Sequence, residues 1–516
     1  MKSLFATAAT VALFAVAGCG GGDSSGSKLA DLAPPGAPIF VEGTPRPTGE
    51  LKASADAIAK QVGGVEGLGD LIVEELESSA QEDGEPFDYA KEVEPWLGER
   101  GGLFFEGLDE EDDPTGLGMM VESTDTEATR EFIDNQVEGS KDPYRSGSYE
   151  GVDYEVGGDE DNAIGVVGDF LALGEGEKVF KEMVDASSGD ALSGEDAFSK
   201  AIGAASDGSL ADVYVDVGDL IEQSGGQIDP TAREFLETAG IDPGEATAVA
   251  SVIPGKDQVA IELSSDLAGR EAPSGDASEL LGSLPGDAFA GFAVSGFGKQ
   301  LQEAIDTLDE QGIPDTIPPH QLKKGLKDLG IDLEGLADSL QNSGAFAVGN
   351  SESSLGGALV LTTEGSQGVE TVDNIVKLLR GFSVSGVTIL GGRYAGFSVR
   401  SDELGDKPLV VVAKEGRVAI GYGLPAALEG LRAGEGNGST LADQADYKAA
   451  VDSLGGTPIT AFADGAGALR LADALIPSSD EGFEEAKKYL KSIGFLALGS
   501  ASQDELATAK LIVGLK

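Results

Sequence analysis

The residue with the clearest chemistry in this chain is Cys19, the only cysteine among 516 residues. A thiol can be acylated or oxidised, and it acts as a nucleophile when a base lies beside it. Cys19 follows Lys2 and a largely apolar stretch from Leu4 to Ala17. A positive charge followed by a short apolar segment and small residues is typical of an export signal, and this segment is shorter than the roughly 20 residues of a transmembrane helix. We therefore predict a signal peptide over residues 1–18.

The sequence Val16-Ala17-Gly18-Cys19 resembles the lipobox of bacterial lipoproteins. In that family the cysteine takes a diacylglycerol on its sulfur and becomes the first residue of the mature protein. The resemblance implies lipidation of Cys19, an extracytoplasmic location and attachment to the membrane through the N-terminal lipid. A free reactive thiol is the competing interpretation, but the sequence near Cys19 contains no histidine that could activate it.

The remaining residues form no convincing catalytic motif. The single histidine, His320, follows two prolines, and we expect it in an exposed loop or at a helix start. One histidine and one cysteine are too few for the usual zinc ligand sets. The pattern Gly-x-Ser-x-Gly of a nucleophile elbow occurs only around Ser24, in a Gly/Ser-rich stretch that we expect to be a flexible tether. We expect no enzymatic activity and no cofactor.

Acidic residues leave two alternatives open. The clusters Asp109–Asp113 and Asp159–Asn162 offer the oxygen ligands that calcium prefers, but they lack the ligand spacing and central glycine of an EF-hand loop. A solvated loop explains them more simply. A hydrolase that uses two carboxylates is an alternative function, although 91 acidic residues offer so many pairs that no single pair stands out.

The charge of the chain excludes one class of function. Its formal net charge is −56, so the phosphates of nucleic acids and anionic lipid headgroups are repelled. We expect no nucleic-acid binding. Cations or a basic protein are the partners that such a surface attracts, and the oligomeric state cannot be read from the sequence.

Four adjacent apolar side chains are candidates for a ligand pocket: Phe104, Phe105, Met119 and Met120. They lie on two neighbouring strand candidates, where they would line an apolar pocket between a sheet and its helices. Packing in an ordinary hydrophobic core explains them equally well.

The elements that position these residues follow an internal repeat of the sequence. Pro35-Gly36-Ala37 and Pro285-Gly286-Asp287 each precede a short apolar strand candidate, and Val213–Asp216 and Ala461–Asp464 match farther along. The matches are collinear, so we predict two homologous units in tandem. The predicted organisation is a lipidated Cys19 with a flexible Gly/Ser tether, a first unit, a linker and a second unit, over residues 19–32, 33–267, 268–282 and 283–516.

Each unit mixes strand and helix patterns. Apolar residues recur at three- and four-residue steps in Ala128–Val137 and in Val369–Leu379, which predicts amphipathic helices. Alternation at Val213, Val215 and Val217 predicts a half-buried strand, and Lys414–Arg417 has the length and glycine of a hairpin turn. We predict an α+β fold in which each unit is a largely antiparallel sheet with packed helices.

The lipobox, the stretch Leu32–Pro38 and the sequence Trp96-Leu97-Gly98 together resemble one family of secreted and lipid-anchored bacterial proteins. The family is common in actinobacteria and is classed only as a domain of unknown function. It implies location and architecture and transfers no catalytic residue. We therefore expect a lipid-anchored binding or scaffolding protein of the bacterial cell envelope, and a carrier or sensor of an apolar envelope ligand is the alternative.

Overall fold

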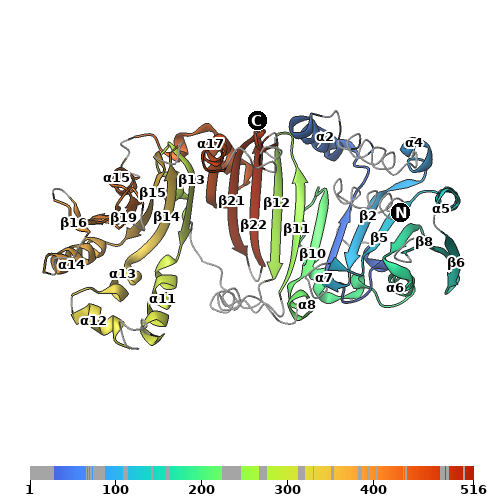
Figure 1. Cartoon of the computed structure of the whole chain (residues 1–516), viewed down its shortest axis with the longest axis horizontal. Helices are drawn as coiled ribbons and strands as arrows, with labels where there is room; N and C mark the ends of the chain where they lie inside the picture. Colours follow the sequence, from blue (N-terminus) through green and yellow to red (C-terminus); the bar gives the residue numbers. More distant parts are fainter. Residues whose placement is uncertain are drawn as a thin grey trace. The chain divides into compact units, whose positions relative to one another are not determined.

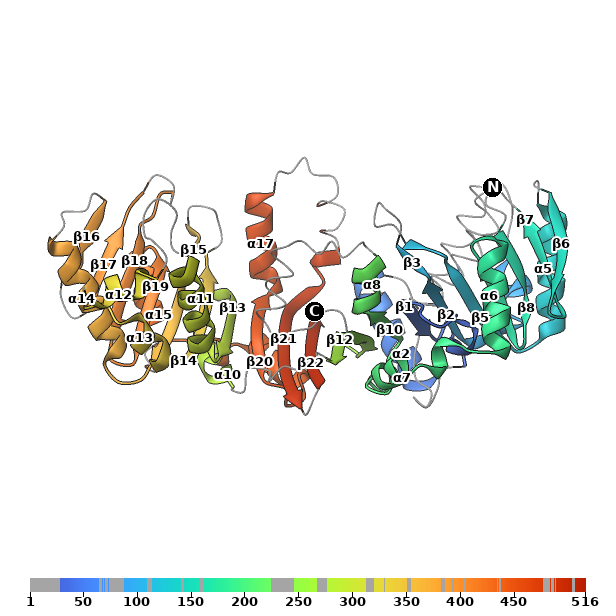
Figure 2. The same cartoon turned by 90° about the horizontal axis from the view of Figure 1, so that it is seen from below.

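The structure is a computed structural model, and the chain divides into two compact units. Unit 1 comprises Met1–Arg270 and Ser502–Lys510, and unit 2 comprises Glu271–Ala501 and Leu511–Lys516. Figures 1 and 2 label the elements of each unit. The structure describes residues 28–64, 67, 69, 73, 88–108, 114–140, 143–157, 162–223, 246–266, 276–311, 320–328, 330–349, 354–381, 386–391, 394–401, 405–433, 435, 438–476, 483, 487, 489–503 and 506–516.

The helices described in unit 1 are η1 (Ala30–Leu32), α2 (Gly49–Ile58) with the π-helical turn η2 (Ala59–Gly63), α4 (Tyr89–Glu92), α5 (Thr126–Gly139), α6 (Gly176–Ser188), η3 (Leu192–Gly194), α7 (Asp196–Ile202) and α8 (Val217–Gln223). Its strands are β1 (Ile39–Gly43), β2 (Leu97–Phe105), β3 (Gly107–Leu108), β4 (Pro114–Thr115), β5 (Gly118–Ser123), β6 (Tyr144–Tyr149), β7 (Val152–Gly157), β8 (Asn162–Val167), β9 (Phe170–Gly174), β10 (Ala211–Asp216), β11 (Thr247–Pro254) and β12 (Gln258–Asp266).

The main sheet of unit 1 is antiparallel throughout the described pairings. Its strands follow the spatial order β6-β7-β8-β9-β5-β2-β1-β10-β11-β12. Successive side chains of a strand point to opposite faces, so each face needs its own cover. Helices α6 and α7 supply Phe180 and Phe198 to the core on one face, where Phe40 and Tyr214 are also buried. Helix α5 supplies Phe132 to a second core, on the other face.

Unit 2 contains the helices α10 (Ser278–Gly282), α11 (Phe297–Gln311), α12 (Leu322–Asp328), α13 (Leu333–Ser339), α14 (Gln367–Gly381), α15 (Leu424–Arg432), η6 (Leu441–Asp443), α16 (Ala445–Ser453) and α17 (Gly465–Leu475). Its strands are β13 (Ala288–Ser295), β14 (Leu340–Val348), β15 (Gly356–Thr363), β16 (Val387–Ile389), β17 (Ala395–Val399), β18 (Leu409–Lys414), β19 (Arg417–Tyr422) and β20 (Ile459–Asp464), and the chain ends with β21 (Ile493–Gln503) and β22 (Leu506–Leu515).

The sheet of unit 2 repeats the pairing scheme of unit 1. Its strands follow the order β16-β17-β18-β19-β15-β14-β13-β20-β21, again antiparallel. Each strand has a counterpart with the same neighbours in unit 1, and α5, α6 and α7 have counterparts in α14, α15 and α16 in the same chain order. The α+β fold with a largely antiparallel sheet is thus observed in both units. A common origin of the two units by duplication stays a prediction.

Local sequence signals explain several element boundaries. Helix α5 begins where the Asp125 carboxylate accepts hydrogen bonds from the backbone N–H groups of Glu127 and Ala128, and it buries the predicted apolar face through Phe132 and Ile133. The predicted hairpin turn joins β18 to β19, with Gly416 at a φ of +79° that glycine adopts without strain. Strand β10 ends at Asp216, one residue before Val217, which the alternation had included in the strand but which begins α8.

The predicted boundaries differ from the structure at two places. The tether was expected to extend to residue 32, but Ala30–Leu32 form η1, and Leu29, Ala30 and Leu32 are buried in the core. The linker was expected to extend to residue 282, but its last five residues form α10. Apolar side chains within both Gly-rich stretches explain the differences, because they find partners in the cores that composition alone does not reveal. The signal peptide over residues 1–18 and most of the tether lie outside the described residues.

Candidate functional site

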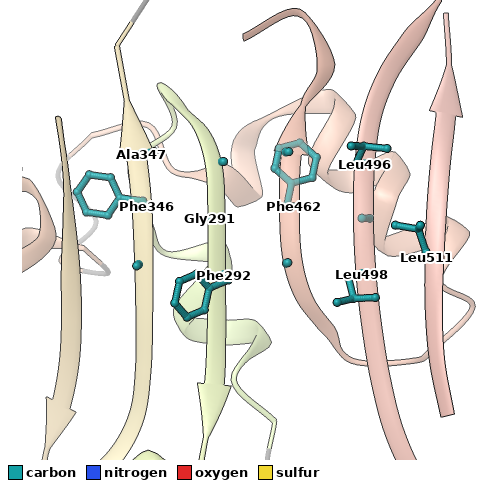
Figure 3. A pocket seen from close by; sticks show the side chains of 13 residues that line it. Gly291, Phe292, Phe346, Ala347, Phe462, Leu496, Leu498 and Leu511 are labelled. Atoms are coloured by element: carbon teal, nitrogen blue, oxygen red, sulfur yellow. The ribbon is translucent and has the colours of Figure 1, made fainter. Parts of the chain in front are cut away.

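The candidate site is an apolar groove on the sheet of unit 2. It crosses β14, β13, β20, β21 and β22 and has a volume of about 460 Å³. Figure 3 shows the groove from close by, with side chains contributed by each of these strands. The lining residues are Ala290, Gly291, Phe292, Ala345, Phe346, Ala347, Ala461, Phe462, Ala463, Leu496, Ala497, Leu498 and Leu511.

The alternation of side chains decides which of these residues face the groove. Phe462 points to the helix-covered face, where its ring packs edge-on against Tyr447 of α16 at 5.3 Å between ring centroids. Its cross-strand partner Gly291 faces the same way: a Cβ there would lie 3.2 Å from the side chains of Leu281 and Leu284 at α10. The residues on either side of Gly291 and Phe462 therefore point to the opposite face, which is the groove face.

Strand register arranges the groove-face residues in two rows that run across the sheet. One row is Ala345, Phe292, Ala461 and Leu498, and the other is Ala347, Ala290, Ala463 and Leu496. Alanines form most of the floor, and the larger Phe292, Leu496 and Leu498 rise from it. These three side chains are 47%, 36% and 38% exposed, so the groove leaves large apolar side chains in contact with water.

The groove is electrically neutral on its lining. No charged side chain occurs among the described residues that line it. The adjacent carboxylate, Asp464 at the end of β20, is already engaged, because it accepts hydrogen bonds from the backbone N–H groups of Ala466 and Gly467 at the start of α17. Such a lining can contribute apolar burial and dispersion to a ligand but no acid, base or nucleophile.

The same face of unit 1 is more deeply buried. The correspondence between the strands is fixed on the opposite, helix-covered face, where Tyr214 packs against Phe198 as Phe462 packs against Tyr447. The counterparts of the two rows are Leu103, Val41, Val213 and Ala250, and Phe105, Ile39, Val215 and Ala248. Val41 is only 7% exposed because it lies in a core with Val93 and Trp96. Packing against Val93 and Trp96 thus buries Val41 in unit 1, whereas Phe292 at the corresponding position of unit 2 is 47% exposed.

The four residues predicted to line a pocket lie in the cores of unit 1. Phe104 and Met120 are in the core against α6, whereas Met119 is in the core against α5, on the opposite face of the sheet. Phe105 packs against that second core and is partly buried. The strand register explains the separation, because adjacent residues of one strand point to opposite faces. The four side chains therefore pack as core residues and do not line one common cavity.

The other sequence candidates give no site in the described part of the chain. Cys19, Asp109–Asp113 and residues 159–161 lie outside the described residues. His320 is exposed just before α12, as expected for a residue at a helix start. The described residues contain no group of three or more His, Cys, Asp or Glu side chains arranged to hold a metal ion. None of the helices in the described ranges is both long enough and apolar enough to span a bilayer.

One carboxyl pair in unit 1 has the divergent titration that an acid–base pair needs. Burial and a hydrogen bond with Glu182 raise the pKa of Glu106 to about 7, and the pKa of Glu182 is lowered, with hydrogen bonds from Glu106 and Lys178 holding it charged. The Lys178 Nζ lies 3.0 Å from Glu106 and 2.8 Å from Glu182. This cluster joins the residue between β2 and β3 to α6, and it is remote in the chain from the groove of unit 2.

Sequence reasoning missed the groove, although the chain contains a signal for it. The triplets Ala345-Phe346-Ala347 and Ala461-Phe462-Ala463 each place a large residue between two small ones. On a strand this pattern buries the phenylalanine on one face and presents only alanines on the other. The strands that carry the triplets, β14 and β20, are neighbours of the same strand, β13, and this pairing cannot be read from the sequence.

Comparison with known proteins places the chain in a family without assigning an activity. A family described as "Protein of unknown function (DUF3352)" matches residues 72–395, which is more than half of the chain. The expected resemblance to a domain of unknown function is thereby confirmed. None of the curated proteins matches the chain.

Among solved structures, the chain is similar to "Structure of crystal form I of TP0453" and "Structure of crystal form III of TP0453". Each has a TM-score of 0.24 and 11% sequence identity and covers 47% of this chain, with 80% and 81% of the other chain covered. A likeness at this TM-score carries no argument about fold or function.

Proposed function

We propose a binding function for this chain, which belongs to the DUF3352 family of proteins of unknown function. In this proposal it is a non-enzymatic, extracytoplasmic protein of the cell envelope, held at a membrane by a lipid on Cys19. Unit 2 binds the acyl chain of a neutral lipid in the groove between Phe292 and Leu498. The lipidation rests on the sequence around Cys19, and the binding rests on the groove.

The exposure of large apolar side chains in the groove is the observation that carries the proposal. Phe292, Leu496 and Leu498 each expose more than a third of their surface on one face of one sheet, around a floor of alanines. Covering this surface with an apolar ligand gains about 25 cal/mol for each Å² removed from water. The groove volume of about 460 Å³ also lies within the range of roughly 300–1,000 Å³ that is typical of ligand sites.

The charge of the chain favours a small neutral ligand over a second copy of the protein. Two chains of net charge −56 repel each other, and the uncharged groove offers no basic group to offset that repulsion. An acyl chain carries no charge and needs no hydrogen-bond partner. A neutral headgroup avoids repulsion by the acidic surface of the protein.

Native mass spectrometry of the protein purified from its own envelope tests whether a ligand is present. We expect an added mass that is lost on extraction with organic solvent. Purification of the Ala461→Glu variant gives the matched sample, because this change places a charge on the groove floor at a partly exposed position. The Leu424→Glu variant is the control, because Leu424 is 41% exposed in the same unit but does not line the groove.

A titration with a fluorescent neutral monoacylglycerol measures the affinity. We expect saturable binding that falls at least tenfold in Ala461→Glu and is unchanged in Leu424→Glu, while urea unfolding shows both variants folded. Equal binding by the two variants, or a bare polypeptide mass together with no saturable binding, would refute the proposal.

A further inference from the structure

A second pocket in unit 2 lies on the opposite face of β20 from the groove. It is bounded by α10, η6, α16, residues 456–458 and the start of β20 at Ile459, and its volume is about 650 Å³. Unlike the groove, it has polar groups on its lining, including the side chains of Asp276, Glu279 and Tyr447. We call it the Tyr447 pocket.

The hydroxyl of Tyr447 is the unusual feature of this pocket. Tyr447 is only 5% exposed, and none of the described residues forms a hydrogen bond with its Oη. The hydroxyl lies beside Gly282 of α10, where a Cβ would be in ordinary van der Waals contact with Tyr447 Oη at 3.4 Å. Burial and the nearby charge of Asp276 raise the pKa of Tyr447 to about 12, so the phenol is neutral at pH 7 and can both donate and accept a hydrogen bond.

Comparison with unit 1 shows that packing does not require this hydroxyl. Phe198 of α7 takes the corresponding place there, with its ring 5.0 Å from Tyr214 at an interplanar angle of 77°. Tyr447 lies 5.3 Å from Phe462 at 70°. A phenylalanine therefore satisfies the same edge-on contact, so packing alone does not call for the hydroxyl. Tyr447 Oη is not among the fully buried polar atoms without a partner in the described residues, so it stays in contact with the space of the pocket. A ligand in the pocket can therefore form a hydrogen bond with it.

The charges around the pocket indicate the kind of ligand. Asp276 and Glu279 are exposed at its rim, and the described lining residues include no basic side chain. The lining serines already donate within the protein, Ser278 to the backbone oxygen of Ile459 and Ser283 to that of Leu280. A cationic ligand is thus attracted by the carboxylates, and it finds the phenol as a free acceptor.

The rest of the wall is apolar. Val451 of α16 is 41% exposed beside the pocket, and Ile459 and Pro458 contribute further apolar surface. Apolar surface does not stabilise a bound metal ion, and the described residues contain no cluster of three or more metal-ligating side chains. An alkyl group attached to the cation would cover this wall.

We propose that the Tyr447 pocket binds a primary ammonium group on an alkyl stem. The ammonium donates hydrogen bonds to Tyr447 Oη and to the carboxylates of Asp276 and Glu279, and the stem packs along Val451 and Ile459. Two sources share this chemistry, a free alkylamine and the lysine side chain of a peptide. The inference does not depend on lipid binding in the groove, because the two sites lie on opposite faces of the sheet and share only residues of β20 as neighbours.

Isothermal titration calorimetry of the full chain with hexylammonium chloride at pH 7 tests the proposal, and 1-hexanol serves as the uncharged probe of the same length. We expect hexylammonium to bind at least tenfold more tightly than hexanol, with an affinity that falls as salt is added. The Tyr447→Phe variant reproduces the residue of unit 1, and we expect it to bind hexylammonium about tenfold more weakly with unchanged stability. Tyr489→Phe removes a tyrosine hydroxyl elsewhere in the unit and should leave binding unchanged.

A second pair of variants tests the proposal even if Tyr447→Phe does not fold. Asp276→Asn and Glu279→Gln change exposed rim residues, and we expect each to weaken hexylammonium binding while leaving hexanol binding unaltered. N-acetyl-lysine methylamide then separates the two sources: tighter binding than hexylammonium indicates a lysine side chain, and weaker binding a free amine. Equal affinities for hexylammonium and hexanol, or no effect of Tyr447→Phe, would overturn the proposal.

Discussion

The same face of the sheet is more deeply buried in unit 1 than in unit 2. The strand pairings are equivalent, but Val41 and Leu103 of unit 1 are replaced at the corresponding positions by Phe292 and Ala345. Val41 is 7% exposed and Phe292 is 47% exposed. One backbone scheme therefore serves a closed core in one unit and an apolar groove in the other, and the difference lies in the side chains and in the elements that cover them.

The helices that follow the first strand of each unit show where that cover differs. In unit 1, α2 follows β1 and contacts β11, the strand beyond β10. In unit 2, α11 follows β13 but packs against α13 and β14. The corresponding segment thus reaches a different part of each sheet. A chain that keeps its pairing scheme can acquire a binding face when the segment that follows the first strand packs against a different part of the sheet.

The largest effect expected from this comparison concerns the two equivalent positions. Val41→Glu buries a charge in the core with Val93 and Trp96 and should lower the free energy of unfolding by about 3–5 kcal/mol. Phe292→Glu changes an exposed side chain and should alter it by less than about 1 kcal/mol, while it abolishes binding of the neutral monoacylglycerol. Urea unfolding of both variants measures the contrast. Similar losses of stability would show that the face of unit 2 is covered in solution.

A smaller loss of stability is expected at a feature that both units share, the close approach of a strand glycine to the following helix. A Cβ on Gly174 would lie 2.4 Å from the backbone nitrogen of Phe180, and one on Gly421 would lie 2.4 Å from that of Ala427. Gly174 is the last residue of β9 and Gly421 the second-last of β19, each against the following helix. Gly174→Ala and Gly421→Ala should therefore each cost about 2–3 kcal/mol through overpacking. Gly139→Ala, where a Cβ meets nothing within 4 Å, should not destabilise the protein. Thermal unfolding of the three variants checks this, and a large loss in only one of the first two would break the equivalence.

The smallest expected effect is a pH dependence of stability that arises from Glu106 in unit 1. Glu106 has a folded pKa of about 7 against an ordinary value of 4.5, so its contribution to stability is fully present below pH 4.5 and is lost as pH rises to about 7. Glu106→Gln cannot ionise. Relative to the unsubstituted protein, it should therefore gain about 1 kcal/mol of stability between pH 5 and pH 8, after allowance for solvent screening. Urea unfolding at both pH values measures it, and a difference independent of pH would show that Glu106 ionises normally.

Much of the fold could be predicted from the sequence because its signals are local. The apolar spacing of α5, the turn before Arg417 and the α+β class follow from residues that are close together in the chain. The groove could not be predicted in this way. It exists because β14, β13, β20 and β21 are neighbours, and those strands come from distant parts of unit 2.

The positions of Phe104, Phe105, Met119 and Met120 depend on strand register in the same way. Their apolar character fits a pocket and an ordinary core alike, and the register of β2 and β5 places Met119 and Met120 in different cores. The role of the Tyr447 hydroxyl could likewise not be predicted from the sequence. Tyr447 and Phe198 occupy equivalent positions because their rings make equivalent contacts with Phe462 and Tyr214, and these contacts appear only in the folded structure. Burial of a polar group is a tertiary property.

Photolabelling tests the central claim most directly. A neutral monoacylglycerol with a diazirine near the end of its acyl chain would be bound to the full protein, irradiated and mapped by peptide mass spectrometry. The groove predicts labels on β13, β20 and β21, at or beside Phe292, Ala461 and Leu498, with loss of the label in Ala461→Glu. Labels on the corresponding strands β1, β10 and β11, or labels spread equally over both units, would contradict the account.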